Sequence, residues 1–264
     1  MKVLVGIPTL NGPDRLDRAL ASVKKHTDLK DVTVLVSDDC SSEKNLKLNK
    51  DVVHTHGVPM LMSGERLGIA KQWNRLVRHV PDAEICVLLN DDVEVVEDWL
   101  DVLVFSLERN PDLGMVALRC ETGVIKKDCP PRPKIDYNEA LLMTGGGTLV
   151  SAGGACFAFR RGNWEHVGGF DERYFCFYEE VDFGVTLATS LGRYSAFASY
   201  PVIYHMGGAT IGANSDASAV LIDSRQKFWD KWGKTMDQWR TARGEAELPN
   251  PVEWNSSWKY ARLP

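Results

Sequence analysis

The chain has 264 residues, a formal net charge of −5 at pH 7, and a composition that is 44% hydrophobic and 25% charged. These values are typical of a globular protein that is long enough to bury a large core without disulfide bonds or structural metals. The acidic balance argues against a surface built to bind nucleic-acid phosphates, so we expect no sequence-specific nucleic-acid partner.

The first half of the chain alternates short apolar runs with amphipathic segments. Apolar runs predict strands at 3–7, 32–36, 85–89 and 115–118, and a weaker run predicts another at 51–56. Apolar residues at helical spacing predict helices that begin near Pro13, Ile69 and Trp99. Strands that alternate with helices in this way predict an α/β fold with a mainly parallel sheet.

The second half has a different character. Residues 120–134 contain two cysteines, three prolines and a basic pair, and we interpret them as a loop. The glycine-rich residues 145–154 are either a tight packing element or, together with that loop, the side that faces a second substrate. Further strands are predicted at 155–159 and 202–204, and further helices at 179–191 and 215–232. The tail beyond residue 240 is polar and contains prolines and two tryptophans, a composition that predicts an extended segment.

Polar clusters lie at the predicted ends of strands and helices. These clusters are Ser37-Asp38-Asp39, Asn90-Asp91-Asp92, Tyr178-Glu179-Glu180-Val181-Asp182, and His205. Each alone is explained by a turn, a helix start or a buried histidine. In open α/β sheets, however, ligands bind beyond the carboxyl ends of the strands. Together, several acids and one histidine there predict a site for a divalent cation, a phosphorylated substrate and a general base.

The usual glycine-rich phosphate loops are absent after the first predicted strand. The glycines there are Gly6 and Gly12, which form neither G-x-G-x-x-G nor a loop that ends in Lys-Ser/Thr. Phosphates bound at this site would therefore be held by a cation and by side chains.

The order of the motifs resembles that of family 2 glycosyltransferases, and in part that of rhamnosyltransferases. The matching segments are residues 6–11, 36–41, 66–74, 88–93, 168–172, 178–183 and 205–210. Each motif is weak alone, but seven in the same order are specific. The resemblance covers about residues 1–232. It implies a Rossmann-like, mainly parallel sheet flanked by helices, of the glycosyltransferase A type, followed by a C-terminal helix and an extended tail.

The resemblance also implies an organisation of the chain. Residues 1–232 would form the catalytic domain, with a nucleotide-binding half at 1–118 and an acceptor and catalytic half at 119–232. Residues 233–264 would form a C-terminal tail.

Roles for individual residues are carried over by position from the same resemblance. Asn90-Asp91-Asp92 matches the family's D-x-D motif, so Asp92 would bind Mn²⁺ or Mg²⁺, with His205 as a further ligand. Glu180 stands where the family usually has an aspartate general base, and Glu179 and Asp182 are the fallback candidates. The residues expected to bind the nucleotide sugar are Pro8, Thr9, Asp38, Asp39, Lys71, Asn90 and Asp91.

The predicted function is therefore metal-dependent, inverting transfer of a sugar from a nucleoside diphosphate sugar to a hydroxyl group. The donor is expected to be UDP-, dTDP- or GDP-linked, and the acceptor a glycan, a lipid-linked glycan, a protein or a small molecule. Two alternatives stay open. One is a non-catalytic module that binds a nucleotide sugar or glycan. The other is a sugar-nucleotide pyrophosphorylase, which would need a glycine- and arginine-rich phosphate loop soon after the first strand, and residues 6–11 do not supply one.

Cysteine usage and apolar runs predict the location of the protein. None of its six cysteines forms a C-x-x-C pair, and no apolar stretch reaches transmembrane length. We expect a reduced, cytoplasmic protein that meets a membrane, if at all, through its acceptor. Trp254 and Trp258 suit a cover for an acceptor cleft or a contact between subunits of a homo-oligomer.

Overall fold

The computed structural model describes residues 1–122, 148–149, 154–206, 217–242 and 262–263. Most of the predicted loop at 120–134 and of the glycine-rich segment at 145–154 lies outside the described residues. Trp254 and Trp258 also lie outside them.

The first half of the chain forms four parallel strands with helices between them. These strands are β1 (Val3–Thr9), β2 (Val32–Asp38), β3 (Met60–Met62) and β4 (Ile85–Leu89). The helices between them are α1 (Pro13–Lys25), α2 (Glu43–His56) and α3 (Ile69–His79). Proline at the first position of α1 suits a helix start, because its missing N–H would have no partner there. This part confirms the predicted α/β alternation.

The rest of the chain, from β5 on, extends the same sheet with mixed strand directions. It contains β5 (Val93–Glu94), α4 (Trp99–Arg109), β6 (Leu113–Thr122), β7 (Thr148–Leu149), β8 (Cys156–Arg160), α5 (Arg161–Val167), α6 (Glu179–Leu191), β9 (Tyr194–His205), α7 (Ala217–Ala242) and β10 (Arg262–Leu263). The strand order is β10-β7-β9-β6-β8-β4-β1-β2-β3, and β5 pairs with β9. Strand β8 runs antiparallel to β4 and to β6, whereas β6 and β9 are parallel.

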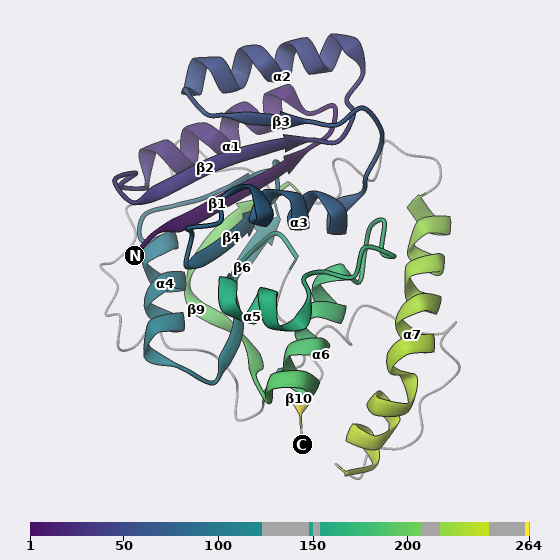
Figure 1. The fold of residues 1–264 in the computed structure, drawn as a ribbon. Coiled ribbons are helices and arrows are strands. Elements are labelled where there is room, and N and C mark those ends of the chain that lie inside the picture. The colour runs from purple at the N-terminus through teal and green to yellow at the C-terminus, as the bar shows by residue number, and fades with distance from the viewer. Residues whose placement is uncertain (123–147, 150–153, 207–216, 243–261, 264) are drawn as a thin grey trace.

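Two hydrophobic clusters pack against opposite faces of the sheet. Successive side chains of a strand point to opposite faces, so Val5 belongs to one cluster and Leu4 to the other. Helices α1 and α4 cover the first face, and α3, α5 and α6 cover the second (Figure 1). Buried apolar area on both faces stabilises the central strands and fixes where their ends lie.

The predicted strand at 51–56 is wrong, because these residues form the end of α2. Two cap signals define that helix. The Ser42 hydroxyl accepts a hydrogen bond from the Asn45 N–H at 3.5 Å, and Gly57 ends the helix in the left-handed conformation. The β-branched pair Val52 and Val53 favoured a strand locally, but the caps and the packing of Val53 in the core outweigh that preference.

Several predicted elements are longer than their patterns indicated. The strand predicted at 115–118 covers Leu113–Thr122, which includes the first residues of the predicted loop at 120–134. The strand predicted at 202–204 begins at Tyr194, and the helix predicted at 215–232 covers Ala217–Ala242. Within the described residues, no helix combines the length and the apolar character needed to cross a membrane.

Candidate active site

Most of the predicted site residues lie at the carboxyl ends of β1, β2 and β4. The parallel register places Pro8 beside Ser37 and Thr9 beside Asp38. Asn90 follows the last residue of β4 directly. In Figure 1 the arrowheads of β1 and β2 point to the right, toward the side on which α7 lies. The sequence therefore correctly indicated that these motifs meet at one edge of the sheet.

Asp38 is fully buried, and its carboxylate is bound by polar groups of the loop after β2 and of α2. The Ser41 N–H donates to Asp38 Oδ1 at 2.8 Å, and the Ser41 hydroxyl donates to Oδ2 at 2.6 Å. The side-chain amide of Asn49 donates to Oδ2 at 2.9 Å. Asp38 thus holds the loop after β2 against helix α2.

Asp39 joins the end of β2 to the start of α3. Its Oδ1 atom accepts hydrogen bonds from the Leu67 N–H at 2.6 Å and from the Gln72 side-chain amide at 2.9 Å. Its Oδ2 atom accepts from Arg66 Nε at 3.1 Å. The Arg66 guanidinium also lies 5.5 Å from the centre of the Phe175 ring. This carboxylate therefore lies where the β2 loop, the α3 start and the segment near residue 175 converge.

Asp91 connects the ends of β1 and β4. The Thr9 hydroxyl donates to Asp91 Oδ2 at 2.7 Å, and Arg15 Nη2 lies 3.4 Å from the same oxygen. Burial raises the pKa of Asp91 to about 6, although Arg15 and the Thr9 hydroxyl favour its charged form. The side chain of Asp91 therefore faces protein groups rather than an open surface.

Asp92 and His205 come together although they lie 113 positions apart in the sequence. His205 Nε2 lies 3.1 Å from Asp92 Oδ1. Strand β5 pairs with the end of β9, which sets Val93 opposite His205, and the Met206 N–H donates to the Asp92 carbonyl at 3.0 Å. The Asp92 side chain is 6% exposed and that of His205 is 26% exposed. The pair is thus fixed by backbone pairing and opens toward the surface.

The Asp92 carboxylate and the His205 imidazole suit a cation site that is completed by a substrate. Among the described residues, no group of three or more His, Cys, Asp or Glu side chains could hold a metal. One carboxylate and one imidazole can hold Mn²⁺ or Mg²⁺ when substrate phosphates and water complete the coordination. The pair therefore fits a cation that binds together with a diphosphate, and does not fit a site built from protein ligands alone.

The acidic cluster at 179–182 forms the first turn of α6. Glu179 and Glu180 are 6% and 5% exposed. The two residues before them, Phe177 and Tyr178, have φ angles of 69°, a left-handed conformation that is costly for aromatic side chains. Negative charge at a helix start is favoured by the helix dipole, so these acids suit the first turn of α6.

Asp182, in the same turn, is bound by three side chains. Lys231 Nζ lies 2.8 Å from Asp182 Oδ1, the Trp232 indole N–H donates to Oδ1 at 2.7 Å, and the Tyr174 hydroxyl donates to Oδ1 at 3.2 Å. Burial raises the pKa of Asp182, and Lys231 opposes this shift. The Asp182 carboxylate therefore binds side chains of the protein itself.

Two predicted binding residues have different environments. Lys71 is exposed on the first turns of α3, and Asn90 is half-buried after β4. Sequence reasoning missed Asn49 and Gln72, whose side chains hold Asp38 and Asp39. The available signal was an amide at a buried position of an amphipathic helix, because a buried polar group there must have a partner.

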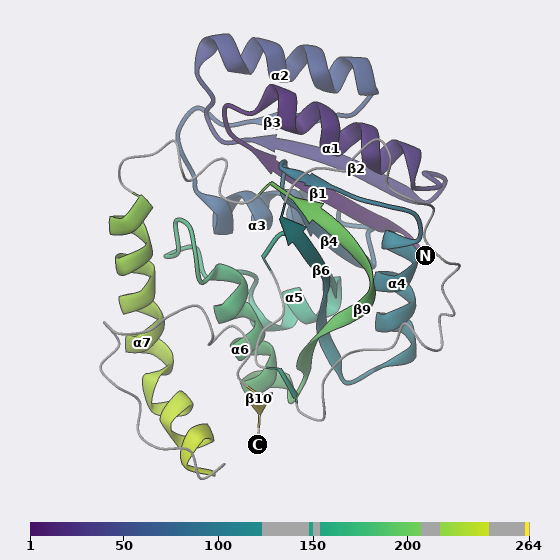
Figure 2. The ribbon, with the colours of Figure 1, turned by 180° about the vertical axis from the view of Figure 1, so that it is seen from behind.

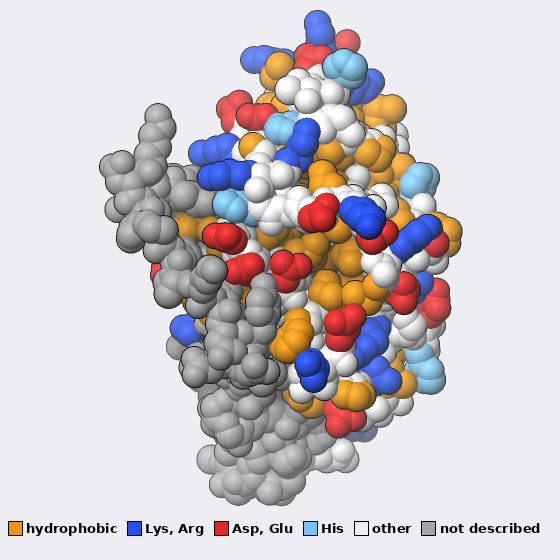
Figure 3. All heavy atoms as spheres, turned by 90° about the vertical axis from the view of Figure 1, so that its left-hand side faces the viewer, with side chains coloured by type: hydrophobic (Ala, Val, Ile, Leu, Met, Phe, Trp, Pro, Cys, Tyr) orange, Lys and Arg blue, Asp and Glu red, His pale blue; other side chains and the backbone are white. Residues whose placement is uncertain are grey.

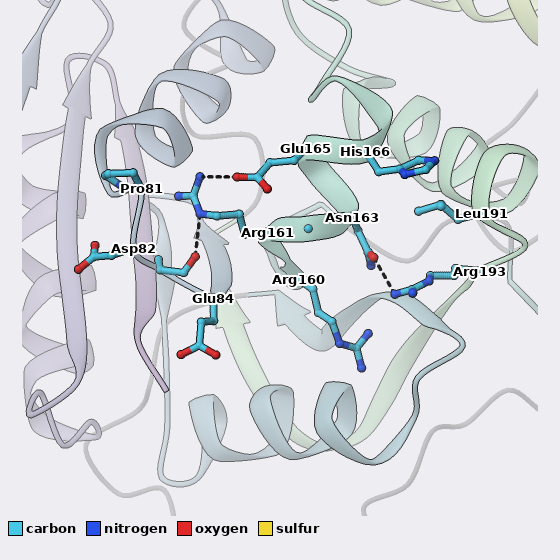
Figure 4. Close-up of a pocket in the computed structure, with 12 residues that line it drawn as sticks. Pro81, Asp82, Glu84, Arg160, Arg161, Asn163, Glu165, His166, Leu191 and Arg193 are labelled. Carbon is cyan, nitrogen blue, oxygen red and sulfur yellow. Dashed lines mark hydrogen bonds and ion pairs between the residues drawn. The ribbon is translucent and has the colours of Figure 1, made fainter.

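A pocket at the opposite edge of the sheet is lined by residues around Glu84 and the start of α5 (Figure 4). Its arginines bind helix ends. Arg161 donates to the carbonyls of Val77 at 2.6 Å and Ala83 at 2.7 Å, and to that of Val80. Figure 3 shows the side of the molecule that lies at the left of Figure 1, and both signs of charge occur on it. The predicted site residues at the ends of β1, β2 and β4 lie at the other edge, so the pocket around Glu84 is a separate structural feature.

Comparison with known proteins places this arrangement in a family. The sequence profile described as "Glycosyl transferase family 2" matches residues 4–168, which is more than half of the chain. An N-acetylglucosaminyl-diphospho-decaprenol L-rhamnosyltransferase from Mycobacterium tuberculosis is 24% identical over 299 residues, which cover 98% of this chain and 94% of that protein.

Solved structures of glycosyltransferases share the fold. A mannosyltransferase from Pyrobaculum calidifontis, in complex with GDP-Man and Mn²⁺, matches with a TM-score of 0.65 and 20% identity, over 96% of this chain and 67% of that one. GalNAc-T7 with UDP, GalNAc and Mn²⁺ matches with a TM-score of 0.62 and 18% identity, over 78% of this chain and 44% of that one. The TarS protein of S. aureus (residues 1–349) matches with a TM-score of 0.58 and 14% identity, over 87% of this chain and 72% of that one.

Proposed function

The chain belongs to glycosyl transferase family 2 and has the glycosyltransferase A-type fold, and on this premise we propose that it performs metal-dependent, inverting sugar transfer. The sugar moves from a nucleoside diphosphate sugar to a hydroxyl group of the acceptor. The observation that carries the proposal is the contact between Asp92 and His205 at the carboxyl edge of the sheet.

Asp92 and His205 are the proposed holders of Mn²⁺ or Mg²⁺. A bound divalent cation would stabilise the negative charge that develops on the leaving diphosphate. Mn²⁺ is present in the mannosyltransferase and GalNAc-T7 structures that share the fold, which supports this choice of cation. Asn90 is a neutral amide, so Asp92 supplies the carboxylate of this motif.

The nucleotide is proposed to lie along the ends of β1 and β2. Pro8 and Thr9 form one wall, Asp38 fixes the loop beneath it, and Asp39 is the acceptor for a base N–H. Uracil, thymine and guanine each carry a ring N–H that a carboxylate can bind, in agreement with UDP-, dTDP- and GDP-linked donors. Lys71, exposed on α3, is proposed to approach the diphosphate.

Glu180 is the proposed general base. It would take the proton of the acceptor hydroxyl as that oxygen forms a bond to the anomeric carbon and the diphosphate leaves from the opposite face. Inversion of the anomeric centre follows from this geometry of attack. Asp182 is the weakest of the three base candidates, because Lys231 and Trp232 already bind its carboxylate. Glu179 is the fallback.

The acceptor is proposed to be a glycan carried on a lipid diphosphate, which would bring the protein to a membrane surface. The support is the M. tuberculosis relative, whose name specifies an N-acetylglucosaminyl-diphospho-decaprenol acceptor and the transfer of L-rhamnose. A rhamnosyl or related deoxysugar donor is proposed on the same basis.

The experiment that tests the function measures release of nucleoside diphosphate from UDP-, dTDP- and GDP-linked sugars with Mn²⁺, without an acceptor. At least one donor should be hydrolysed slowly, and chelation of the metal should stop the reaction. In the Glu180→Gln variant the rate should fall about 10²- to 10⁴-fold, because the amide cannot accept the proton of the attacking water.

Glu108→Gln, an exposed residue on α4, is the matched control and should keep the wild-type rate. Normal turnover by Glu180→Gln would remove this residue from the mechanism. Undiminished turnover under chelation would contradict the metal role.

A further inference from the structure

The segment that carries the proposed base has a strained backbone. Phe177 and Tyr178 both adopt the left-handed conformation immediately before α6. Such residues persist only where the surroundings hold them, and they are concentrated at functional sites. The surroundings of this segment therefore determine where Glu179 and Glu180 are presented.

Helix α3 holds the segment from one side. The Ile69 N–H donates to the Phe175 carbonyl at 2.7 Å. Gly68, which precedes it, has a φ of 81°, and a Cβ atom there would lie only 2.4 Å from the same carbonyl oxygen. The Gly68 N–H also lies 3.3 Å from the Asp39 carboxylate. The turn formed by Gly68 and Ile69 thus connects the proposed nucleotide pocket to the segment that carries the proposed base.

Helix α7 holds the segment from the other side, and lies beside α6 in both Figure 1 and Figure 2. The Ser224 hydroxyl donates to the Cys176 carbonyl at 2.7 Å, directly before the two strained residues. The Phe228 ring lies 5.2 Å from that of Tyr178, centre to centre. Ser224 is fully buried by this packing.

The strongest connection is made by Lys231 and Trp232 of α7 to Asp182 in the first turn of α6. Lys231 Nζ is 2.8 Å from Asp182 Oδ1 and 3.1 Å from Asp171 Oδ2. The Asp182 side chain is only 3% exposed, so loss of Lys231 would leave a buried carboxylate without this cation. Lys231 thus joins α7 to the start of α6 and to the loop before it.

We infer that α7 is a positioning element for the general base, in which Lys231 and Trp232 fix the first turn of α6 through Asp182. This inference rests on the proposed function of Glu180. Neither Lys231 nor Trp232 needs to touch a substrate: each acts by keeping the Glu180 carboxylate where the acceptor hydroxyl arrives. A displacement of about 1 Å at such a point can cost about 10²-fold in rate.

The test uses three variants. Lys231→Met keeps the aliphatic stem and removes the charge, whereas Lys231→Arg keeps the charge. Trp232→Phe removes the indole N–H donor and part of the ring. Lys234→Met, an exposed lysine one turn further along α7, is the matched control. The readouts are kcat and KM for release of nucleoside diphosphate, with the donor that the Mn²⁺ panel selects, and the thermal midpoint of unfolding.

For Lys231→Met, kcat should fall about 10- to 100-fold. The donor KM should stay unchanged, because the proposed nucleotide pocket lies at the ends of β1 and β2 and not on α6 or α7. Trp232→Phe should lower kcat less. Lys231→Arg should restore most of kcat, and Lys234→Met should match the wild type.

The inference would be overturned by a wild-type kcat for Lys231→Met, or by equal losses of kcat in Lys231→Met and Lys234→Met. A loss that appears only as a raised KM would also contradict it. These outcomes differ from failure of the proposed function, in which Glu180→Gln itself keeps normal turnover.

Discussion

Asp91 and Asp92 are neighbours in the chain, but their carboxylates have different partners. Asp91 turns to Thr9 and Arg15 in the interior, whereas Asp92 faces His205 near the surface. Both residues lie in the turn between β4 and β5, where backbone contacts set their directions separately: the Asp92 carbonyl accepts from the Met206 N–H, beside His205. Two acids that look equivalent in sequence therefore serve a structural and a proposed metal-binding role.

The residues at strand ends could be predicted from sequence because apolar runs that stop at acids mark the edge where ligands bind. The residues that hold them could not. Asn49 and Gln72 belong to helices, and only the folded structure shows that their amides reach Asp38 and Asp39. The contact between Asp182 and Lys231 spans 49 positions, a distance at which local patterns carry no information.

Asp171 should make stability depend on pH. A hydrogen bond from Arg173 holds the pKa of Asp171 well below its usual range, and Lys231 contributes further. Because the pKa is lower in the folded state, the stabilisation is present above the unfolded-state pKa of about 4 and is lost as the pH falls below it. Asp171→Asn should therefore lower the free energy of unfolding by about 1 kcal/mol at pH 7, and by less at pH 3.

Urea denaturation at the two pH values measures this difference, with Asp51→Asn, exposed on α2, as the control. A deficit in Asp171→Asn that is as large at pH 3 as at pH 7 would argue against a charge-based contribution.

At the scale of elements, helix-capping residues determine the structure where the local preference for helix or strand is ambiguous. Residues 51–56 contain two adjacent valines and favour a strand, yet Ser42 and Gly57 bound a helix that includes them. Both cap signals are visible in the sequence, Ser42 well before the ambiguous run and Gly57 directly after it. The short strands β3 and β5 offered no such signal, because each is defined only by pairing with a neighbouring strand.

The turn before α3 contacts both Asp39, in the proposed nucleotide pocket, and Phe175, in the segment that carries the proposed base. Gly68→Ala should lower the free energy of unfolding by about 2 to 4 kcal/mol, because a positive φ and a collision with the Phe175 carbonyl act together. Gly57→Ala is the matched control, since Gly57 also has a positive φ, of 63°, but has nothing within 4 Å of the added Cβ.

Gly57→Ala should therefore cost only about 1 kcal/mol. Chemical denaturation of the two variants measures the difference. Equal losses would mean that the close approach of Gly68 to Phe175 contributes nothing to stability.

At the scale of the whole molecule, two parts of one sheet position two groups of predicted site residues. The parallel strands β1 to β4 present Pro8, Thr9, Asp38 and Asp39, and the mixed strands beyond them bring His205 to Asp92. The alternation of elements predicted the first part. The second part depends on β8, which reverses direction between β4 and β6, and a pattern of buried residues does not specify strand direction.

The central claim is that Asp92 and His205 hold a divalent cation together with the diphosphate of the donor. Calorimetric titration of UDP, dTDP and GDP, with Mn²⁺ and with a chelator, tests it without knowledge of the sugar or the acceptor. At least one nucleotide should bind with Mn²⁺ and lose about tenfold or more in affinity on chelation, which corresponds to about 1.4 kcal/mol. Asp92→Ala should bind that nucleotide equally weakly with and without Mn²⁺. Wild-type affinity that is the same in chelator, or an Asp92→Ala variant that keeps its dependence on Mn²⁺, would contradict the account.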